Sequence, residues 1–154
     1  MTTDIPNEPT PNLPGTPHPA PLSQSDERTF AMLAHLSVLA NLFTAFLGPA
    51  IPLILYLVYK DRSRYVAYHS LQSLFFELIA WVGGGALTAA AWTITGVLSA
   101  FIVGLICIPF ACIISLLPLA AIIYGIVGAA QCSQGQDFRY WLIGDWVRGT
   151  FTGQ

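Results

Sequence analysis

Long apolar stretches, separated by one short charged segment, dominate the chain from residue 30 onward. Between Phe30 and Tyr59 there is no Lys, Arg, Asp or Glu, and a second apolar stretch begins at Val66. Because about 20 mostly apolar residues cross the hydrocarbon core of a bilayer as a helix, the pattern predicts an all-α, polytopic helical membrane protein. The three transmembrane spans predicted lie at about 30–59, 66–92 and 96–130, within a helical membrane domain of residues 26–135.

Breaks within these stretches leave an alternative open. A helix over the whole of 30–59 would measure about 45 Å, more than a bilayer core requires. Gly48, Pro49 and Pro52 are therefore expected to kink the first span, or to divide it into a span and a short shoulder. If residues 66–130 were divided into three shorter spans, the chain would have four in all, but no polar turn marks the additional break.

The first 25 residues differ in composition from everything that follows. Seven of the eleven prolines lie in this segment, which holds almost nothing apolar to bury. Such a segment cannot offset the entropy lost on ordering, so residues 1–25 are predicted to form a disordered, proline-rich tail. The segment lacks a basic stretch followed by an apolar core, so it is not expected to be a signal peptide.

Composition supports a membrane environment and excludes one class of partner. Hydrophobic residues make up 55% of the chain and charged residues only 9%, whereas soluble domains carry about 25% charged residues. The predicted partner is the lipid bilayer, together with further copies of the chain in a homo-oligomer or other membrane proteins. The sequence has no basic patch to follow a nucleic-acid backbone, so nucleic acid is excluded as a partner.

Lys60, Arg62 and Arg64 form the only basic cluster between the predicted spans. Short basic loops stay on the cytoplasmic side of a membrane. The loop 60–64 is therefore predicted to be a topology signal and to be cytoplasmic, in a bacterial cytoplasmic membrane. With three spans the carboxyl terminus is cytoplasmic too, and the acidic amino-terminal tail lies on the opposite side.

Polar residues gather on one face of the second predicted span. His69, Gln72, Ser73 and Glu77 lie within about 140° of one another on a helix. Glu77 lies about two turns further into the membrane than His69, where an ionisable group marks either a functional site or a polar contact between spans. Ser37 and Asn41 share a face of the first span and complete the candidate polar intramembrane site.

The chain offers few residues for catalysis or for a metal centre. His35 lies near the start of the first span, and two histidines with one deep carboxylate make only a weak case for a metal. Cys107, Cys112 and Cys132 show no Cys-x-x-Cys spacing and are interpreted as small packing residues. The motifs of a nucleophile elbow, a phosphate-binding loop and a zinc-protease helix are missing. The sequence therefore predicts no enzyme, no catalytic or metal site and no cofactor.

Small residues repeat every four positions in three places and predict close contacts between helices. The three sets are Ala80, Gly84 and Thr88; Gly96, Ala100 and Gly104; and Ala121, Gly125 and Ala129. Such sets favour a tight bundle or an oligomer.

Aromatic residues mixed with charged ones fill the carboxyl-terminal segment 136–154. Trp141 and Trp146 occur beside Arg139 and Arg148, in a stretch too short and too charged to span. Rings mixed with basic residues suit the headgroup layer of a membrane. This segment is therefore predicted to lie along the cytoplasmic interface.

Four stretches of sequence carry a resemblance to a known family. They are MLAHLS at 32–37, GPAIPLILYLVYKDRSRYV at 48–66, HSLQSLFFEL at 69–78 and IIYGIVGAAQCSQGQDFRY at 122–140. Over about residues 26–145 the chain resembles small bacterial membrane proteins related to the twenty-kilodalton core component of the chloroplast inner-envelope protein translocon, the Tic-twenty-like family. It departs from that pattern where Trp141 follows Tyr140 in place of proline, and where Leu74 precedes Phe75 in place of asparagine.

The resemblance implies a helical subunit of a protein-conducting membrane complex, by analogy of fold. The leading hypothesis from sequence is a non-enzymatic, Tic-twenty-like membrane protein that acts as a subunit or scaffold of a membrane complex. The alternative is a small channel or transporter, with a polar path between spans that runs through the candidate polar site.

Overall fold

The computed structural model describes residues 19–141 and 143–152, and all regular structure within those ranges is helical. In chain order the elements are α1 (Gln24–Leu36), η1 (Ser37–Ala40), α2 (Asn41–Thr44), α3 (Ala50–Tyr59), α4 (Arg64–Glu77), η2 (Leu78–Gly83), α5 (Gly84–Ser99), α6 (Gly104–Ile114), α7 (Leu117–Ser133) and α8 (Ile143–Thr152). η1 is a short 3-10 helix and η2 is a π-helix. The prediction of an all-α fold is confirmed.

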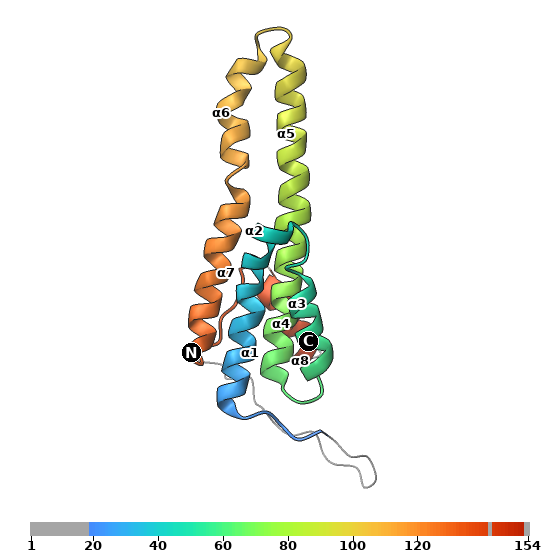
Figure 1. The fold of residues 1–154 in the computed structure, drawn as a ribbon, viewed down its shortest axis with the longest axis vertical. Helices are drawn as coiled ribbons and strands as arrows, with labels where there is room; N and C mark the ends of the chain where they lie inside the picture. Colours follow the sequence, from blue (N-terminus) through green and yellow to red (C-terminus); the bar gives the residue numbers. More distant parts are fainter. Residues whose placement is uncertain (1–18, 142, 153–154) are drawn as a thin grey trace.

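Two long helices form an antiparallel hairpin (Figure 1). The first consists of α4, η2 and α5 and runs from Arg64 to Ser99, and the second consists of α6 and α7 and runs from Gly104 to Ser133. Both are long and apolar enough to cross a membrane. At 1.5 Å per residue they measure about 54 and 45 Å. These helices correspond to the second and third predicted spans.

The turn of the hairpin lies at residues 100–103, later than the predicted break between Trp92 and Gly96. Trp92 does not end its helix: its indole nitrogen donates a hydrogen bond across the hairpin to the Ser115 hydroxyl, at 2.9 Å. Gly104 lets the turn close tightly, since a Cβ there would overlap the backbone of Ser99.

The first apolar stretch, predicted as a span at 30–59, folds back on itself instead. α1, η1 and α2 run along the hairpin but end well short of its tip, the chain turns at residues 45–49, and α3 returns beside α4 (Figure 1). The helix stops at Ala45, whose φ of 62° is left-handed, and Pro49 precedes the first residue of α3. In the described part of the chain, two helices, rather than the three or four predicted, are candidates to span a membrane.

The start of α1 and the basic turn before α4 lie together at the open end of the hairpin (Figure 1). The Ser63 hydroxyl donates to the Glu27 carboxylate at 2.6 Å, and Arg62 Nε donates to the Ala20 carbonyl at 3.0 Å. The structure thus differs from the sequence-based topology, which put the amino-terminal tail opposite the basic loop. The first stretch returns to the side on which it began. Most of the predicted disordered tail, 1–25, lies outside the described residues.

Apolar side chains cover the outside of the long hairpin. Leu87, Ile106, Phe110 and Ile123 are each more than half exposed. In the most apolar part of the two long helices only 11% and 17% of the residues are buried inside the protein. An exposed apolar surface of this extent marks contact with lipid or with another apolar surface, so the exterior supports membrane association.

Small residues bring α7 close to α1. Ala121, Gly125 and Ala129, one of the three predicted sets, are buried, and α7 packs against α1. A Cβ at Gly125 would lie 3.2 Å from the His35 carbonyl oxygen in α1 and 2.7 Å from a Val38 methyl carbon in η1, the second too close without a shift of the helices. Gly96 has no such role, because a Cβ there would meet nothing within 4 Å.

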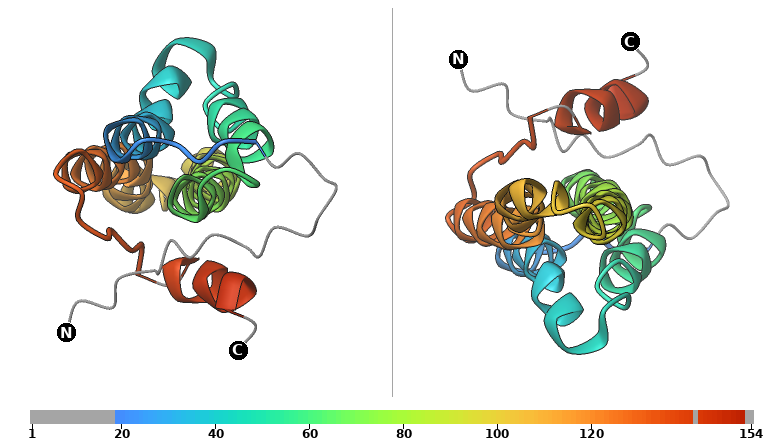
Figure 2. Two further views of the ribbon diagram at one scale, coloured as in Figure 1. Left: turned by 90° about the horizontal axis from the view of Figure 1, so that it is seen from below. Right: turned by 90° about the horizontal axis from the view of Figure 1, so that it is seen from above.

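The carboxyl-terminal segment packs back against α4. Phe138 and Tyr140 are buried, and the Tyr140 ring stacks on Phe76 with centroids 3.9 Å apart. α8 lies on the opposite side of the long hairpin from the turn between α2 and α3 (Figure 2). Trp141 and Trp146 are 79% and 60% exposed, which suits the predicted interfacial position. That position stays a prediction.

Residues 25 and 60 are expected to face the same side of the membrane. In a Cys107→Ser/Cys112→Ser background, Ser25→Cys and Lys60→Cys, both at exposed positions, should react with a membrane-impermeant thiol reagent in the same orientation of sealed vesicles. The background protein, whose remaining cysteine is buried, is the control. Labelling from opposite sides would contradict the folded-back first stretch.

Candidate functional site

The polar face of α4 is buried from the first turn to the last. Ser63 caps the helix, with its hydroxyl accepting a hydrogen bond from the Val66 backbone N–H at 3.1 Å. The predicted site residues on this helix are His69, Gln72, Ser73 and Glu77, each 0% exposed. Buried polar atoms need partners within the protein, and most polar atoms of these four side chains find theirs in three clusters, whereas His69 Nε2 has none among the described residues.

Glu77, at the end of α4, joins that helix to η1 and α2. Its Oε1 accepts a hydrogen bond from the Ser37 hydroxyl, and its Oε2 accepts one from Asn41 Nδ2 at 2.8 Å. Ser73 Oγ lies 3.5 Å from Glu77 Oε1 and donates to the Ala34 carbonyl at 2.6 Å. The structure therefore brings together four of the predicted site residues, Ser37, Asn41, Ser73 and Glu77.

Asn41 extends this cluster to the turn at 45–49. Its Oδ1 accepts a hydrogen bond from Gly48 N at 2.9 Å while its Nδ2 donates to Glu77. A side chain at position 48 would overlap both the Asn41 amide and the Glu77 carboxylate, so glycine is required there. Glu77 and Asn41 thus fix the point at which the first apolar stretch reverses direction.

Gln72 holds the carboxyl-terminal segment. Its Nε2 donates to the Phe138 carbonyl at 3.2 Å, and its Oε1 accepts from Tyr140 N at 3.0 Å. The Tyr68 hydroxyl also donates to Oε1, at 3.1 Å. Both the nitrogen and the oxygen of the Gln72 amide are therefore hydrogen-bonded, and the side chain attaches the backbone of residues 138–140 to α4.

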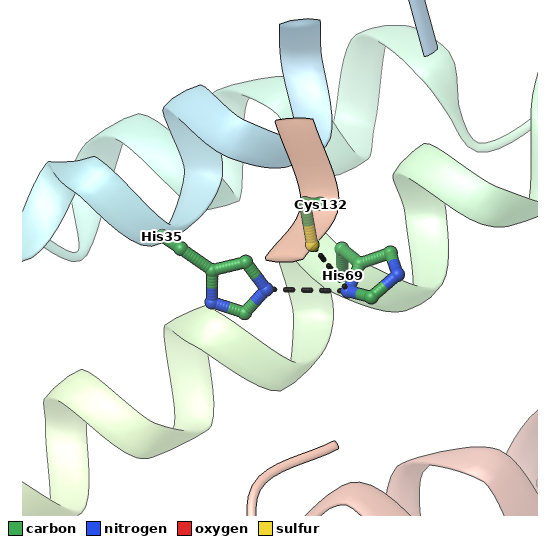
Figure 3. A group of neighbouring side chains, drawn as sticks. All are labelled: His35, His69 and Cys132. Carbon is green, nitrogen blue, oxygen red and sulfur yellow. Dashed lines mark hydrogen bonds between the residues drawn. The ribbon is translucent and has the colours of Figure 1, made fainter. Parts of the chain in front are cut away.

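His69 belongs to a third cluster, formed with His35 of α1 and Cys132 of α7 (Figure 3). His69 Nδ1 is 3.2 Å from His35 Nε2 and 3.5 Å from Cys132 Sγ. All three side chains are 0% exposed. On its other side, His35 Nδ1 is 3.1 Å from the Tyr140 hydroxyl. Burial raises the pKa of the Tyr140 phenol well above its usual range, so this partner of His35 is a neutral hydroxyl.

The sequence analysis missed this third cluster. Cys132 was interpreted as a packing residue, and the two histidines were considered as metal ligands only together with a deep carboxylate, yet the side chains of His35 and Cys132 both meet His69 (Figure 3). One signal was present: Cys132 follows Gly125 by seven positions and Ala129 by three, so it continues the same face of α7. The bond between His35 and Tyr140 joins residues far apart in the chain, and no sequence spacing indicates it.

The three basic residues predicted as a topology signal lie away from these clusters, in the turn before α4 and at its start. Lys60 is exposed. Arg62 places its guanidinium carbon 5.7 Å from the centre of the Tyr59 ring. Arg64 is the first residue of α4.

Replacing Gln72 is expected to release the carboxyl-terminal segment. Gln72→Ala leaves the buried backbone groups of Phe138 and Tyr140 without this partner, at a cost of about 1–3 kcal/mol for each group. Trypsin cleavage after the exposed Arg139 should therefore become several times faster. Ser133→Ala, which removes an exposed hydroxyl bonded to Ala130 of its own helix, is the control and should be cleaved like the wild type. Equal rates in the two variants would contradict the role of Gln72.

Comparison with known proteins identifies the family. A family model described as the magnetosome magnetite crystal formation protein family matches residues 26–147, a range that contains all three clusters. No curated protein and no solved structure matches the chain. The resemblance to the Tic-twenty-like family is therefore wrong: the four stretches quoted for it lie within the range of a different family. The chain belongs to the magnetosome magnetite crystal formation protein family.

Proposed function

We propose that this chain is a non-enzymatic integral membrane protein of the magnetosome and takes part in magnetite crystal formation. The observation that carries the proposal is the family match, which covers most of the chain and all the buried polar clusters. The two membrane-length helices, with apolar side chains on their outer faces, support the location. Long apolar helices with exposed sides are stable in lipid, where their backbone groups are bonded internally.

The open end of the hairpin faces the cytoplasm in this proposal. Lys60, Arg62 and Arg64 lie at that end, together with the start of α1. Basic residues close to the ends of spans favour the cytoplasmic side. The turn at 100–103, where Phe101 and Ile102 are exposed, then lies toward the opposite face of the membrane.

The molecular role that we infer is that of a structural subunit or scaffold in a membrane complex. Asn41 and Gln72 direct their hydrogen bonds to other parts of the same chain. A channel or transporter, the alternative from sequence, would need these groups to line a path. Because these side chains instead join segments of the same chain, the geometry favours a structural role. The apolar outer faces of α5 and α6 remain available to lipid, a second copy or another membrane protein.

Deletion of the gene in a magnetite-forming host is expected to change the size, number or shape of the crystals seen by electron microscopy. The wild-type chain should restore them. Glu77→Ala should not, because it removes the carboxylate that bonds Ser37 and Asn41. Thr93→Ala is the control and should restore normal crystals, since the Thr93 hydroxyl is exposed and donates its hydrogen bond to Ala89 of its own helix.

Two outcomes would count against this account. Crystals unchanged by the deletion would contradict a part in magnetite formation. Ion flux through the purified protein in liposomes, abolished by Glu77→Gln, would favour the channel over the scaffold.

A further inference from the structure

Three side chains with metal-binding atoms converge at one buried point, and each comes from a different helix (Figure 3). His35 Nε2, His69 Nδ1 and Cys132 Sγ all lie within 4.8 Å of one another. We propose that these atoms bind one transition-metal ion of the zinc type, through two imidazole nitrogens and one thiolate. The proposal is independent of the function proposed above.

Two of the three distances between the ligand atoms are close to those of tetrahedral ligands. Zinc bonds of about 2.0–2.1 Å to nitrogen and about 2.3 Å to sulfur put two ligand nitrogens about 3.3 Å apart, and a nitrogen and a sulfur about 3.6 Å apart. Here His69 Nδ1 is 3.2 Å from His35 Nε2 and 3.5 Å from Cys132 Sγ. The third pair, His35 Nε2 and Cys132 Sγ, lies within 4.8 Å. A side-chain movement of at most about 1.2 Å brings it to the tetrahedral N–S distance, and a fourth coordination position is then left for an added ligand.

Hydrogen bonds alone do not satisfy this cluster. His69 Nδ1 offers either one proton or one lone pair, yet His35 and Cys132 both approach it. His69 Nε2 is buried and has no hydrogen-bond partner among the described residues. A metal ion would remove the need for two hydrogen bonds at His69 Nδ1, because it accepts a lone pair from each of the three ligand atoms at once.

The surroundings of His35 resemble those of a metal ligand. Histidines that bind metals usually bond their second ring nitrogen to another group, which orients the ring. Here the Tyr140 hydroxyl lies 3.1 Å from His35 Nδ1, so Nε2 is turned toward the cluster. Gly128 makes room for this arrangement, since a Cβ there would lie 2.7 Å from the Phe138 ring and 3.2 Å from His35 Cγ.

The donor set selects the class of metal. Imidazole and thiolate suit zinc and related transition metals, whereas calcium and magnesium require oxygen ligands. Among divalent ions Fe²⁺ binds such sites more weakly than Zn²⁺. On binding, Cys132 releases its thiol proton to solvent and both imidazoles bind in the neutral form. The ion would tie α1, α4 and α7 together at one point.

Cobalt substitution tests the proposal directly. The probe is Co²⁺ added to the purified full chain in mild detergent, in the Cys107→Ser/Cys112→Ser background, so that any thiolate signal comes from Cys132. We expect one Co²⁺ per chain, with a thiolate-to-cobalt charge-transfer band and the intense visible bands of tetrahedral cobalt. One equivalent of Zn²⁺ should bleach both, and Fe²⁺ should compete less well than Zn²⁺.

Variants separate this site from unspecific binding. Adding Cys132→Ser to the background should abolish the charge-transfer band and weaken Zn²⁺ binding. Tyr140→Phe should keep the band but weaken binding about 10- to 100-fold, as loss of an orienting partner does. In the otherwise wild-type chain, Cys112→Ser changes an exposed thiol in α6 and should leave Zn²⁺ binding unchanged.

Two results would overturn the proposal. One is a folded background protein that binds no cobalt or gives no charge-transfer band. The other is Zn²⁺ binding that is the same with and without Cys132. If Cys132→Ser does not fold, the cobalt spectrum of the background protein alone tests the proposal, because His35, His69 and Cys132 are all unchanged in that protein.

Discussion

Polar groups that are shut away from water must be satisfied by other parts of the same chain, and this constraint organises the structure around α4. The helix carries a buried row of polar side chains along its whole length. Glu77 binds the segment that leads into the turn at 45–49, Gln72 binds the backbone of residues 138–140, and His69 meets α1 and α7. The segments that Glu77 and Gln72 bind are thus held in place by hydrogen-bonding groups of α4 that would otherwise be unsatisfied. The folded-back first stretch and the docked carboxyl-terminal segment are both consequences.

The same constraint divides the molecule into two parts at Glu77. Up to that residue α4 is buried among other segments, whereas none of the residues of η2, which follows, is buried. The wider turn of a π-helix shifts the direction of side chains, and such turns are frequent at functional sites. Beyond it, α5 pairs mainly with α6, and their outer faces are apolar. One continuous helix therefore joins an end with buried hydrogen bonds between segments to an apolar hairpin. This arrangement suits a membrane protein whose polar contacts gather at one end.

The all-α fold class, the two long helices and the polar face of α4 could be predicted from the sequence, because each depends on the local pattern of apolar and polar residues. The sequence pattern also put Ser37 and Asn41 in one candidate site with Glu77, and both side chains donate hydrogen bonds to the Glu77 carboxylate. It put a break at Gly48 and Pro49, where the chain does turn, but it did not predict that the chain reverses there. Apolar composition alone does not distinguish a membrane crossing from short helices joined by a turn. The reversal depends on a hydrogen bond from Gly48 to Asn41, and the cluster of His35, His69 and Cys132 on packing between three helices. Contacts of that kind between distant parts of the chain leave no regular spacing in the sequence. The family assignment from four short motifs failed for a related reason, since short membrane motifs carry little information about lineage.

A double-mutant cycle between Asn41→Ala and Glu77→Ala is the most direct test of the claim that α4 organises the fold through buried hydrogen bonds. The free energy of unfolding would be measured in mild detergent for the wild type, both single variants and the double variant. Residues that share a buried hydrogen bond are coupled by about 0.5–3 kcal/mol. We expect a coupling of about 1 kcal/mol or more, with each single variant less stable than the wild type. If the double variant is destabilised by the sum of the two single changes, to within about 0.3 kcal/mol, the two side chains act independently. That result would contradict the proposed role of α4.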